Sequence, residues 1–304
     1  MPIKKTDKIW YNGKLVDWDK AQIHVLTHAL HYGSGVFEGI RCYRTDKGPA
    51  VFRLREHVER LFQSARLYYM DVPYKVEQVE QAIKDTINAN RIEACYIRPI
   101  IYRGYGEMGL NPLNAPVDVA VAVWPWGTYL GEEGLKNGIR ACISSVERFN
   151  SNVIPTRAKA TGQYINSILA KVQALKAGYE EAILLDNRGM VSEGPGENIF
   201  LVKGGRLITP PEHASLLMGI TRDSVIQLAK SLGIEVVETD VDRGMLYTAD
   251  EVFFTGTAAE VTPIREVDGH VIGKPGPVTK SVQNRFFEIV AGSDKSFEHW
   301  LARV

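Results

Sequence analysis

The stretch from residue 157 to residue 166 reads Arg157-Ala158-Lys159-Ala160-Thr161-Gly162-Gln163-Tyr164-Ile165-Asn166. Its one lysine, Lys159, stands among Ala, Thr and Gly, whose small side chains leave open space around the amine. The spacing of apolar residues predicts a helix directly afterwards, over 163–177, ended by Gly178. Lysine is usually a solvated surface charge. The small neighbours are therefore the first indication that Lys159 faces something other than water.

Two later segments carry glycines and an acidic residue in patterns that suit a bound group. They read Ser192-Glu193-Gly194-Pro195-Gly196-Glu197-Asn198-Ile199-Phe200 and Leu217-Met218-Gly219-Ile220-Thr221-Arg222. Gly194 and Gly196 let the backbone approach a neighbouring group closely. The last segment begins a helix predicted over 221–232, and the free N–H groups of a helix N-terminus bind anions. Without these neighbours, Glu193 would be read as a solvated turn residue.

Three segments of the first half add aromatic rings and a guanidinium group. They read Tyr32-Gly33-Ser34-Gly35-Val36-Phe37-Glu38-Gly39-Ile40-Arg41, Tyr96-Ile97-Arg98-Pro99 and Trp124-Pro125-Trp126-Gly127. Tyr96 and Arg98 are two residues apart in a strand predicted over 94–102, so they point to the same face. A guanidinium fork beside a phenol suits a carboxylate. A single aromatic residue more often belongs to the core, so only the whole set indicates a pocket.

Together these segments resemble the signature of the class IV, or fold-type IV, pyridoxal-phosphate aminotransferases. The first-half segments resemble the bacterial branched-chain amino acid aminotransferases within that class. The resemblance runs from about Ile9 to the C-terminal helix. One departure is Pro195, where the family has a small residue; it affects loop geometry and removes no chemical group. The resemblance implies an α+β fold of two domains, with the cofactor at the domain interface.

The resemblance also implies roles in binding pyridoxal 5'-phosphate. Lys159 corresponds to the catalytic Schiff-base lysine, which must be neutral to attack an aldehyde, a state that burial favours by lowering its pKa. Glu193 corresponds to the partner of the pyridine nitrogen, and Tyr164 to the partner of the ring hydroxyl. Arg60 corresponds to the phosphate-binding arginine, although a solvated helix face is the alternative for it. The remaining phosphate ligands would be Gly219, Ile220, Thr221, Gly256 and Thr257.

Substrate contacts are implied in the same way. The amides of Thr257 and Ala258 would bind the α-carboxylate with help from Tyr96, and Arg98 would take the second carboxylate of glutamate. Leu110 would reach the neighbouring subunit's site. The apolar box for leucine, isoleucine or valine would consist of Tyr32, Phe37, Trp126, Tyr129 and Tyr164.

The resulting hypothesis is ping-pong transamination between Leu, Ile or Val and 2-oxoglutarate. D-amino-acid aminotransferases and aminodeoxychorismate lyases share the lysine and the glutamate, but the Tyr96/Arg98 pair and the Trp126/Tyr129 segment argue against both. An (R)-amine transaminase is excluded less firmly. A cofactor-binding protein without catalytic activity is disfavoured by the complete set of catalytic residue types.

Length and composition set the broader expectations. The chain has 304 residues, of which 45% are apolar, and its 36 basic and 36 acidic side chains cancel. We expect a smaller N-terminal domain over 1–126, an interdomain loop over 127–137 and a C-terminal domain over 138–304 that carries Lys159. Neutral charge predicts no nucleic-acid or membrane partner. We expect a cytoplasmic protein, and the resemblance implies a homodimer, often assembled into a hexamer.

Two patterns could mislead. Gly104, Gly106 and Gly109 match the dinucleotide-binding pattern G-x-G-x-x-G, but Pro112 and Pro116 forbid the helix that this pattern requires. We therefore expect a loop over 104–116. The cysteines are odd in number and the histidines form no HExxH motif, so we expect reduced thiols and no metal site.

Local patterns predict the other main elements. Asn12-Gly13 between two short apolar runs predicts a hairpin over Ile9–Val16. Apolar residues at helical spacing predict helices over 53–70 and 76–90. Short apolar runs predict strands over 117–124, 139–148, 182–185 and 251–254.

Overall fold

The computed structural model describes residues 3–127 and 129–304, so Thr128, in the expected interdomain loop, lies outside the described residues. The chain divides into two compact units. Unit 1 consists of Met1–Trp126, Ala158–Gln163 and Ile289–Val304, and unit 2 of Gly127–Arg157 and Tyr164–Glu288.

This division differs from the expected domains, because Lys159 and the C-terminus belong to unit 1. Backbone pairing is the physical reason. Ala160 forms a β-bridge with Val36, and the Phe37 N–H donates to the Lys159 carbonyl (3.0 Å). The last strand, β17 (Leu301–Arg303), pairs antiparallel with β5 (Gly48–Phe52). Hydrogen-bonded neighbours far apart in sequence therefore override chain order.

Unit 1 is built on an eight-stranded sheet among the described residues, in the order β17-β5-β4-β6-β7-β1-β2, with β3 paired to β6. Its longest pair is antiparallel and sets Tyr96 opposite Trp124 and Arg98 opposite Ala122. The remaining strands are β1 (Lys8–Tyr11), β2 (Lys14–Asp17), β3 (Gly35–Phe37), β4 (Ile40–Thr45), β6 (Cys95–Arg103) and β7 (Val117–Trp124).

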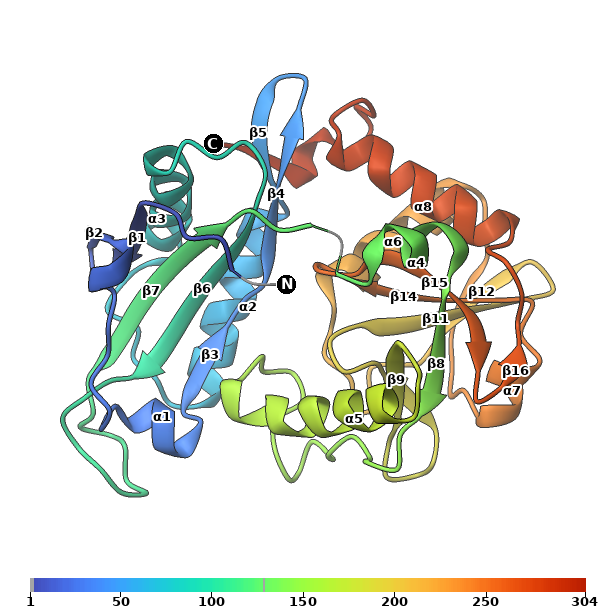
Figure 1. Ribbon diagram of the computed structural model, residues 1–304, viewed down its shortest axis with the longest axis horizontal. Helices are drawn as coiled ribbons and strands as arrows, with labels where there is room; N and C mark the ends of the chain where they lie inside the picture. Colours follow the sequence, from blue (N-terminus) through green and yellow to red (C-terminus); the bar gives the residue numbers. More distant parts are fainter. Residues whose placement is uncertain (1–2, 128) are drawn as a thin grey trace. The chain divides into compact units, whose positions relative to one another are not determined.

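Two helices, α2 (Leu54–Leu67) and α3 (Val76–Ala89), pack against each other and against this sheet (Figure 1). Val58, Leu61 and Ala65 recur at helical spacing on α2 and are fully buried, as their periodicity predicts. They join one hydrophobic core with the inner residues of α3 and of the sheet. The short helices are η1 (Trp18–Lys20), α1 (His28–Tyr32), η2 (Thr161–Gln163) and η3 (Glu298–Trp300).

Unit 2 is built on a nine-stranded mixed sheet among the described residues, in the order β10-β9-β8-β15-β14-β11-β12-β13, with β16 paired to β15. The β8–β9, β8–β15 and β12–β13 pairs are parallel. The strands are β8 (Ile139–Ile143), β9 (Glu181–Leu185), β10 (Val191–Glu193), β11 (Asn198–Lys203), β12 (Arg206–Thr209), β13 (Val236–Glu238), β14 (Glu251–Gly256), β15 (Glu260–Val267) and β16 (His270–Val271).

Helices of unit 2 pack against this sheet. Among them, α4 contacts β15, α5 contacts β9, and α6 contacts β13 and β14. They are α4 (Gly131–Asn137), α5 (Tyr164–Lys176), α6 (Ile220–Ser231), α7 (Arg243–Tyr247) and α8 (Pro277–Val290).

Most predicted elements are confirmed. The Asn12-Gly13 hairpin forms with Ile9 opposite Val16, and the predicted helices and strands occur within a few residues of their expected ends. The strand expected over 139–148 ends earlier, at Ile143. The stretch over 104–116 contains no helix, as expected for a loop.

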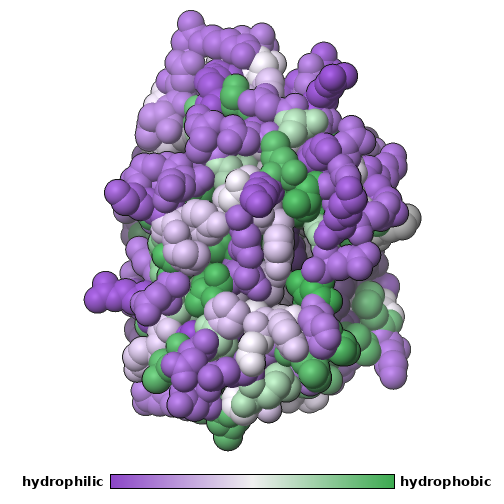
Figure 2. Space-filling model, turned by 90° about the vertical axis from the view of Figure 1, so that its left-hand side faces the viewer, coloured by the Kyte–Doolittle hydropathy of each residue, from purple (hydrophilic) through white to green (hydrophobic). Residues whose placement is uncertain are grey.

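The surface seen in Figure 2 is mainly hydrophilic, with several separate hydrophobic patches. Within the described part of the chain, every helix is too short or too polar to cross a membrane.

Candidate active site

The backbone of Lys159 is held from two sides within unit 1. Its N–H donates to the Ser64 hydroxyl (3.0 Å), and its carbonyl accepts from Phe37 (3.0 Å). The Lys159 ammonium nitrogen lies 5.4 Å from the centroid of the Phe37 ring. Ser64 and Phe37 come from α2 and β3, both parts of the packed core. Lys159 therefore extends from a short segment whose position the core determines.

Behind this segment, α2 presents a buried ionic cluster. Glu38 is fully buried and accepts two hydrogen bonds from Arg60, at 2.6 and 2.8 Å. It also lies 2.8 Å from Nδ1 of His57, which is buried as well. Burial alone would raise the pKa of Glu38, but the Arg60 charge and the hydrogen bond from His57 outweigh it and hold this pKa well below its usual range.

His57 completes the cluster as a neutral ring. Burial lowers the pKa of His57, and the charges of Arg60 and Lys159 act in the same direction, so that together they outweigh the opposing effect of Glu38. The neutral ring therefore donates Nδ1–H to the Glu38 carboxylate. Arg60 is 12% exposed and lies at the edge of the cluster. Glu38 fixes its guanidinium group through a bidentate contact, the geometry that this pair forms most strongly.

Phe37, Tyr96 and Trp126, three candidate substrate residues of unit 1, form an aromatic cluster with Arg98. The Arg98 guanidinium carbon lies 4.6 Å from the centroid of the Phe37 ring and 5.4 Å from that of Tyr96. Tyr96 in turn contacts Trp126, with centroids 5.1 Å apart. A Cβ atom on Gly39 would meet the Tyr96 hydroxyl at 2.0 Å, so only glycine admits this phenol. Phe37 thus links Arg98 to Lys159.

An apolar cavity of about 410 Å³ adjoins this cluster. Arg98 and Thr161 contribute to its wall, and the rest is largely aliphatic. The other lining residues are Ile9, Tyr11, Ala21, Ile23, Ala29, Leu30, Ile100, Tyr102, Ala120 and Ala122. Its size is that of a small-molecule site, and it places a cation beside apolar walls.

In unit 2, Glu193 is buried at the end of β10 and is positioned by charge and by hydrogen bonds. One carboxylate oxygen lies 2.8 Å from Nε of Arg148. The other accepts from the Leu217 N–H (2.9 Å) and from the Asn198 side chain (3.3 Å). These contacts favour the ionised carboxylate.

The predicted anion site lies at the N-terminus of α6. Gly219 precedes the helix, and Ile220 and Thr221 form its first turn, where N–H groups lack intrahelical partners. The Asn198 side chain connects this turn to Glu193, because its amide also donates to the Leu217 carbonyl (2.9 Å). A Cβ atom on Gly219 would meet the Asn198 oxygen at 1.9 Å, so a larger residue there would displace the Asn198 side chain.

Gly256 ends β14 and approaches the same loop as Glu193. A Cβ atom on it would lie 3.2 Å from the Gly196 carbonyl oxygen. Thr257 and Ala258 come next, in the turn that leads to β15, and both are half-buried. Unit 2 therefore gathers Glu193, the start of α6 and the Gly256 turn around Asn198 and Gly196.

Four candidate residues lie outside the Arg98 cluster of unit 1 and outside the group around Glu193 in unit 2. In unit 1, Tyr32 is 45% exposed at the end of α1, and Leu110 is 90% exposed on the 104–116 loop. In unit 2, Tyr164 begins α5 and is half-buried. The Tyr129 ring lies 5.3 Å from the Lys171 ammonium group.

Several buried polar residues of the site were not predicted. His57 and Ser64 lie three residues before and four after Arg60, on one face of α2, and this spacing could have revealed them. Glu38 stands next to the predicted Phe37 in the quoted sequence. Asn198 stands in the quoted segment, five residues after Glu193. Arg148 gave no comparable signal, because its contact with Glu193 joins residues that are far apart in the chain.

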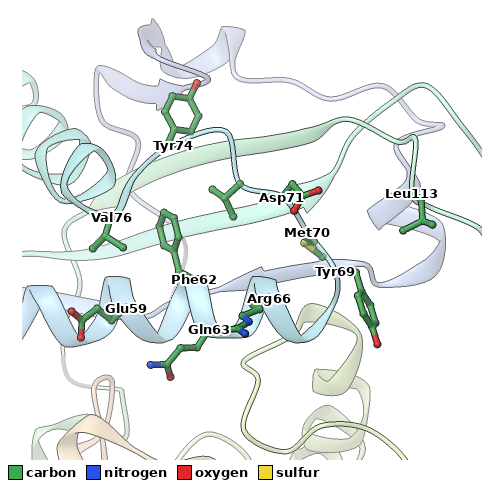
Figure 3. A pocket seen from close by; sticks show the side chains of 11 residues that line it. Glu59, Phe62, Gln63, Arg66, Tyr69, Met70, Asp71, Tyr74, Val76 and Leu113 are labelled. Carbon is green, nitrogen blue, oxygen red and sulfur yellow. The ribbon is translucent and has the colours of Figure 1, made fainter.

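A second hollow, of about 840 Å³, opens along the outer side of α2 (Figure 3). Figure 3 shows Phe62 and Arg66 from the helix and Tyr69 and Asp71 from the turn after it, with Leu113 at the far end. None of its lining residues belongs to the predicted cofactor or substrate set.

Comparison with known proteins decides the family. The model of the amino-transferase class IV family matches residues 35–267. The chain belongs to the class IV aminotransferases. This confirms the resemblance of the sequence motifs and the α+β fold expected from them.

This class IV aminotransferase has close relatives of known activity. It is 50% identical to the branched-chain-amino-acid aminotransferase of Escherichia coli, with 100% of this chain and 99% of the relative covered. It is 48% identical to the one of Pseudomonas aeruginosa, with 97% of each covered.

Solved structures agree with this assignment. The crystal structure of the E. coli branched-chain amino acid aminotransferase superposes with a TM-score of 0.97 at 50% identity, covering 98% of this chain and 99% of that one. The branched-chain amino acid aminotransferase from Thermobaculum terrenum, solved in its PLP form, gives a TM-score of 0.92 at 37% identity, covering 98% of both.

Proposed function

We propose that this class IV aminotransferase transfers amino groups between leucine, isoleucine or valine and 2-oxoglutarate, with pyridoxal 5'-phosphate as cofactor. The observation that carries the substrate assignment is the Arg98 cluster. It combines one half-buried cation with aromatic and aliphatic walls, next to Phe37 and Lys159. Such a site accepts the apolar side chain of a branched-chain amino acid and also the second carboxylate of glutamate or 2-oxoglutarate. The reaction needs both, because the two kinds of substrate bind in turn.

The residues of the chain fit this cofactor. Lys159 offers an amine on a rigid segment, and Arg60 a guanidinium fixed by Glu38. Glu193 offers a buried carboxylate for a ring nitrogen, and the start of α6 offers N–H groups for a phosphate. When bound, the pyridine ring of pyridoxal phosphate accepts electrons from the substrate α-carbon.

The chain itself supplies proton transfer and orientation. Nζ of Lys159 removes the substrate α-proton and returns it on the cofactor side, which requires a neutral amine during turnover. Ser64 and Phe37 keep the backbone of Lys159 in place, so the amine moves by side-chain rotation alone. Glu193 lies beside Arg148, and a carboxylate in that place would favour a protonated ring nitrogen.

The amides of Thr257 and Ala258 would bind the α-carboxylate, and Tyr96 would assist. Arg98 would bind the second carboxylate of glutamate or 2-oxoglutarate in a charge-assisted, bidentate manner. For leucine, the same space is filled by the aliphatic side chain against Phe37 and Trp126. The guanidinium then stays over the Phe37 ring, a favourable cation–π position.

We also propose a cytoplasmic homodimer that assembles further into a hexamer, in which Leu110 reaches the neighbouring subunit's site. Exposed apolar residues support association. Leu110 is 90% exposed, and one side of α5 leaves five aliphatic side chains between 42% and 62% exposed. These are Ile165, Ile168, Leu169, Val172 and Leu175. Size-exclusion chromatography with light scattering tests the assembly.

Two experiments test the function. Lys159→Ala should bring transamination of L-leucine below detection, while Lys176→Ala, an exposed lysine on α5, should retain the wild-type rate. The wild-type protein should transaminate L-leucine, L-isoleucine and L-valine with 2-oxoglutarate, and not D-alanine. A Lys159→Ala protein with normal turnover, or a wild type that prefers D-alanine, would refute the proposal.

A further inference from the structure

His28, the first residue of α1, lies at the centre of contacts that join two candidate substrate residues. It is only 3% exposed. Its backbone N–H donates to the Gly104 carbonyl (3.1 Å), where the 104–116 loop leaves β6. Its ring lies 4.6 Å from the Tyr32 ring, centroid to centroid. All of these residues belong to unit 1.

Both ring nitrogens of His28 have defined partners. Nε2 lies 2.9 Å from the Gly109 carbonyl oxygen, and Nδ1 lies 2.6 Å from the Ser34 hydroxyl. A carbonyl oxygen can only accept, so Nε2 carries the hydrogen. In the neutral ring Nδ1 then accepts from the Ser34 hydroxyl. This assignment satisfies every polar atom of the imidazole.

The bond to Gly109 matters because the next residue is Leu110. Gly109 has a positive φ of +114°, a backbone conformation that side chains rarely adopt. Leu110 extends into open space, 90% exposed. The peptide before Leu110 is therefore fixed by His28, and the direction of the Leu110 side chain depends on that peptide.

The two ends of the loop are held independently of His28. The Gly104 N–H donates to the Pro116 carbonyl (2.7 Å). The buried Arg103 donates to the carbonyls of Ala115 and Tyr69. Loss of the His28 ring should consequently release the middle of the loop while its ends stay in place.

We propose that His28 is a positioning residue that sets substrate preference, because it holds the Tyr32 ring and the Gly109–Leu110 peptide in one arrangement. This inference rests on the proposed function, with Tyr32 in the apolar box for the substrate side chain and Leu110 reaching the neighbouring subunit's site. Lys159 is held by Ser64 and Phe37 instead. The effect of His28 should therefore appear in substrate binding more than in proton transfer.

Three substitutions separate the contacts of His28. His28→Gln keeps a donor that can reach Gly109, and His28→Asn keeps a group that can reach only Ser34. His28→Phe keeps a ring against Tyr32 and loses both hydrogen bonds. Ser34→Ala is the matched control, because it removes the partner of Nδ1 and leaves the bond to Gly109.

We expect KM for L-leucine to rise about tenfold in His28→Phe and His28→Asn, because both lose the hydrogen bond to Gly109 that fixes the peptide before Leu110. His28→Gln and Ser34→Ala keep that bond and should stay within about threefold of wild type. The kcat should change little in all four, and the ratio of kcat/KM for leucine over valine should shift only in the first two. Thermal unfolding and the absorption of the bound cofactor report folding and loading.

Two results would overturn the proposal. One is an equal loss in His28→Gln and His28→Asn, with the leucine-to-valine ratio unchanged, which indicates a purely structural role. The other is a fall in kcat without a change in KM. Failure of the proposed function is distinguishable, because then the wild type itself does not transaminate leucine. If His28→Phe does not fold, the comparison of the glutamine and asparagine variants decides.

Discussion

Each unit buries a glutamate near the candidate site, and the two carboxyl groups have opposite pKa shifts. In unit 1, Glu38 lies between Arg60 and His57, and their charge and hydrogen bond hold its pKa well below the usual range despite complete burial. In unit 2, burial raises the pKa of Glu197 to about 8, and the nearby carboxylates of Glu181 and Glu193 add to the shift.

Glu38 and Glu197 differ in the cations that lie close to their carboxyl groups. Arg60 and Glu38 form a bidentate pair. Lys171, whose charge acts on Glu197, is paired with another carboxylate. Lys171 pairs with Glu181 at 2.7 Å, and Arg148 with Glu193 at 2.8 Å. Glu197 accepts one backbone hydrogen bond, from Gly196. Pairing with Arg60 therefore keeps Glu38 charged despite its burial, whereas burial keeps Glu197 protonated at neutral pH.

The largest expected effect on stability comes from neutralising the paired carboxylate. Glu38→Gln leaves Arg60 buried against a neutral amide, and breaking one partner of a buried ion pair costs about 3–5 kcal/mol of unfolding free energy. Urea denaturation at pH 7, followed by tryptophan fluorescence, measures this loss.

Glu197→Gln is the matched control for Glu38→Gln. Because Glu197 holds a proton at pH 7, the amide resembles the native group, and the variant should lose no stability there. Equal losses in both variants would show that burial alone, and not pairing, determines the cost.

The pH dependence of stability should differ in sign between the two residues. Between the ordinary value of 4.5 and the folded pKa of about 8, folded Glu197 keeps a proton that the unfolded chain has released. Its contribution to stability therefore falls as pH rises, by at most about 1.4 kcal/mol per pH unit. Glu38 behaves oppositely, because its lowered pKa contributes stability above 4.5 that is lost as pH falls.

Denaturation series from pH 4 to pH 9 on wild type, Glu197→Gln and Glu38→Gln would resolve these slopes. Relative to wild type, Glu197→Gln should gain stability steadily above pH 5. An identical slope in wild type and Glu197→Gln would contradict the assigned protonation of Glu197.

A smaller effect should come from Ser64, on the α2 face that also carries His57 and Arg60. Ser64→Ala removes the acceptor of the Lys159 N–H, and we expect kcat to fall about tenfold, because one positioning hydrogen bond is lost. Steady-state kinetics with L-leucine measure this change. Thr86→Val, which removes a buried hydroxyl on α3 that bonds to Ala82, should leave kcat unchanged. A similar fall in both would mean that general destabilisation is responsible.

The smallest effect should come from an exposed arginine–glutamate pair on the same helix. Arg55 lies 2.7 Å from Glu59, but both side chains are nearly half exposed. Water screens such pairs and their side chains lose entropy on pairing. Glu59→Gln should therefore keep the wild-type urea midpoint. A loss comparable to that of Glu38→Gln would show that helix position, rather than burial, governs these pairs.

Local sequence patterns predicted much of the fold. Asn12-Gly13 specifies its hairpin because a two-residue turn needs positive φ values, and both residues have them. The periodicity of Val58, Leu61 and Ala65 predicted which face of α2 is buried. Both signals act over a few residues, so sequence spacing alone expresses them.

Site residues could be predicted only where they belong to a motif or lie a few residues from one another. Lys159, Glu193 and the start of α6 stand out in the chain. The residues that hold Lys159 and Glu193 in place do not stand out in the sequence. Arg148 and Glu193 are 45 residues apart by their numbers, and the Ser64 bond to Lys159 spans 95 residues. The sequence placed Lys159 in a C-terminal domain, whereas the contacts group it with unit 1, because the bridge between Ala160 and Val36 is invisible in chain order.

The sequence by itself determined the family, the catalytic lysine expected from it and the helix that would bind the phosphate, because these depend on residue type and short spacing. Tertiary structure alone decided which buried carboxylates keep their charge and which residues hold Lys159 and the Leu110 loop. The physical reason is that burial, ion pairing and hydrogen bonding arise between residues that only the folded chain brings together.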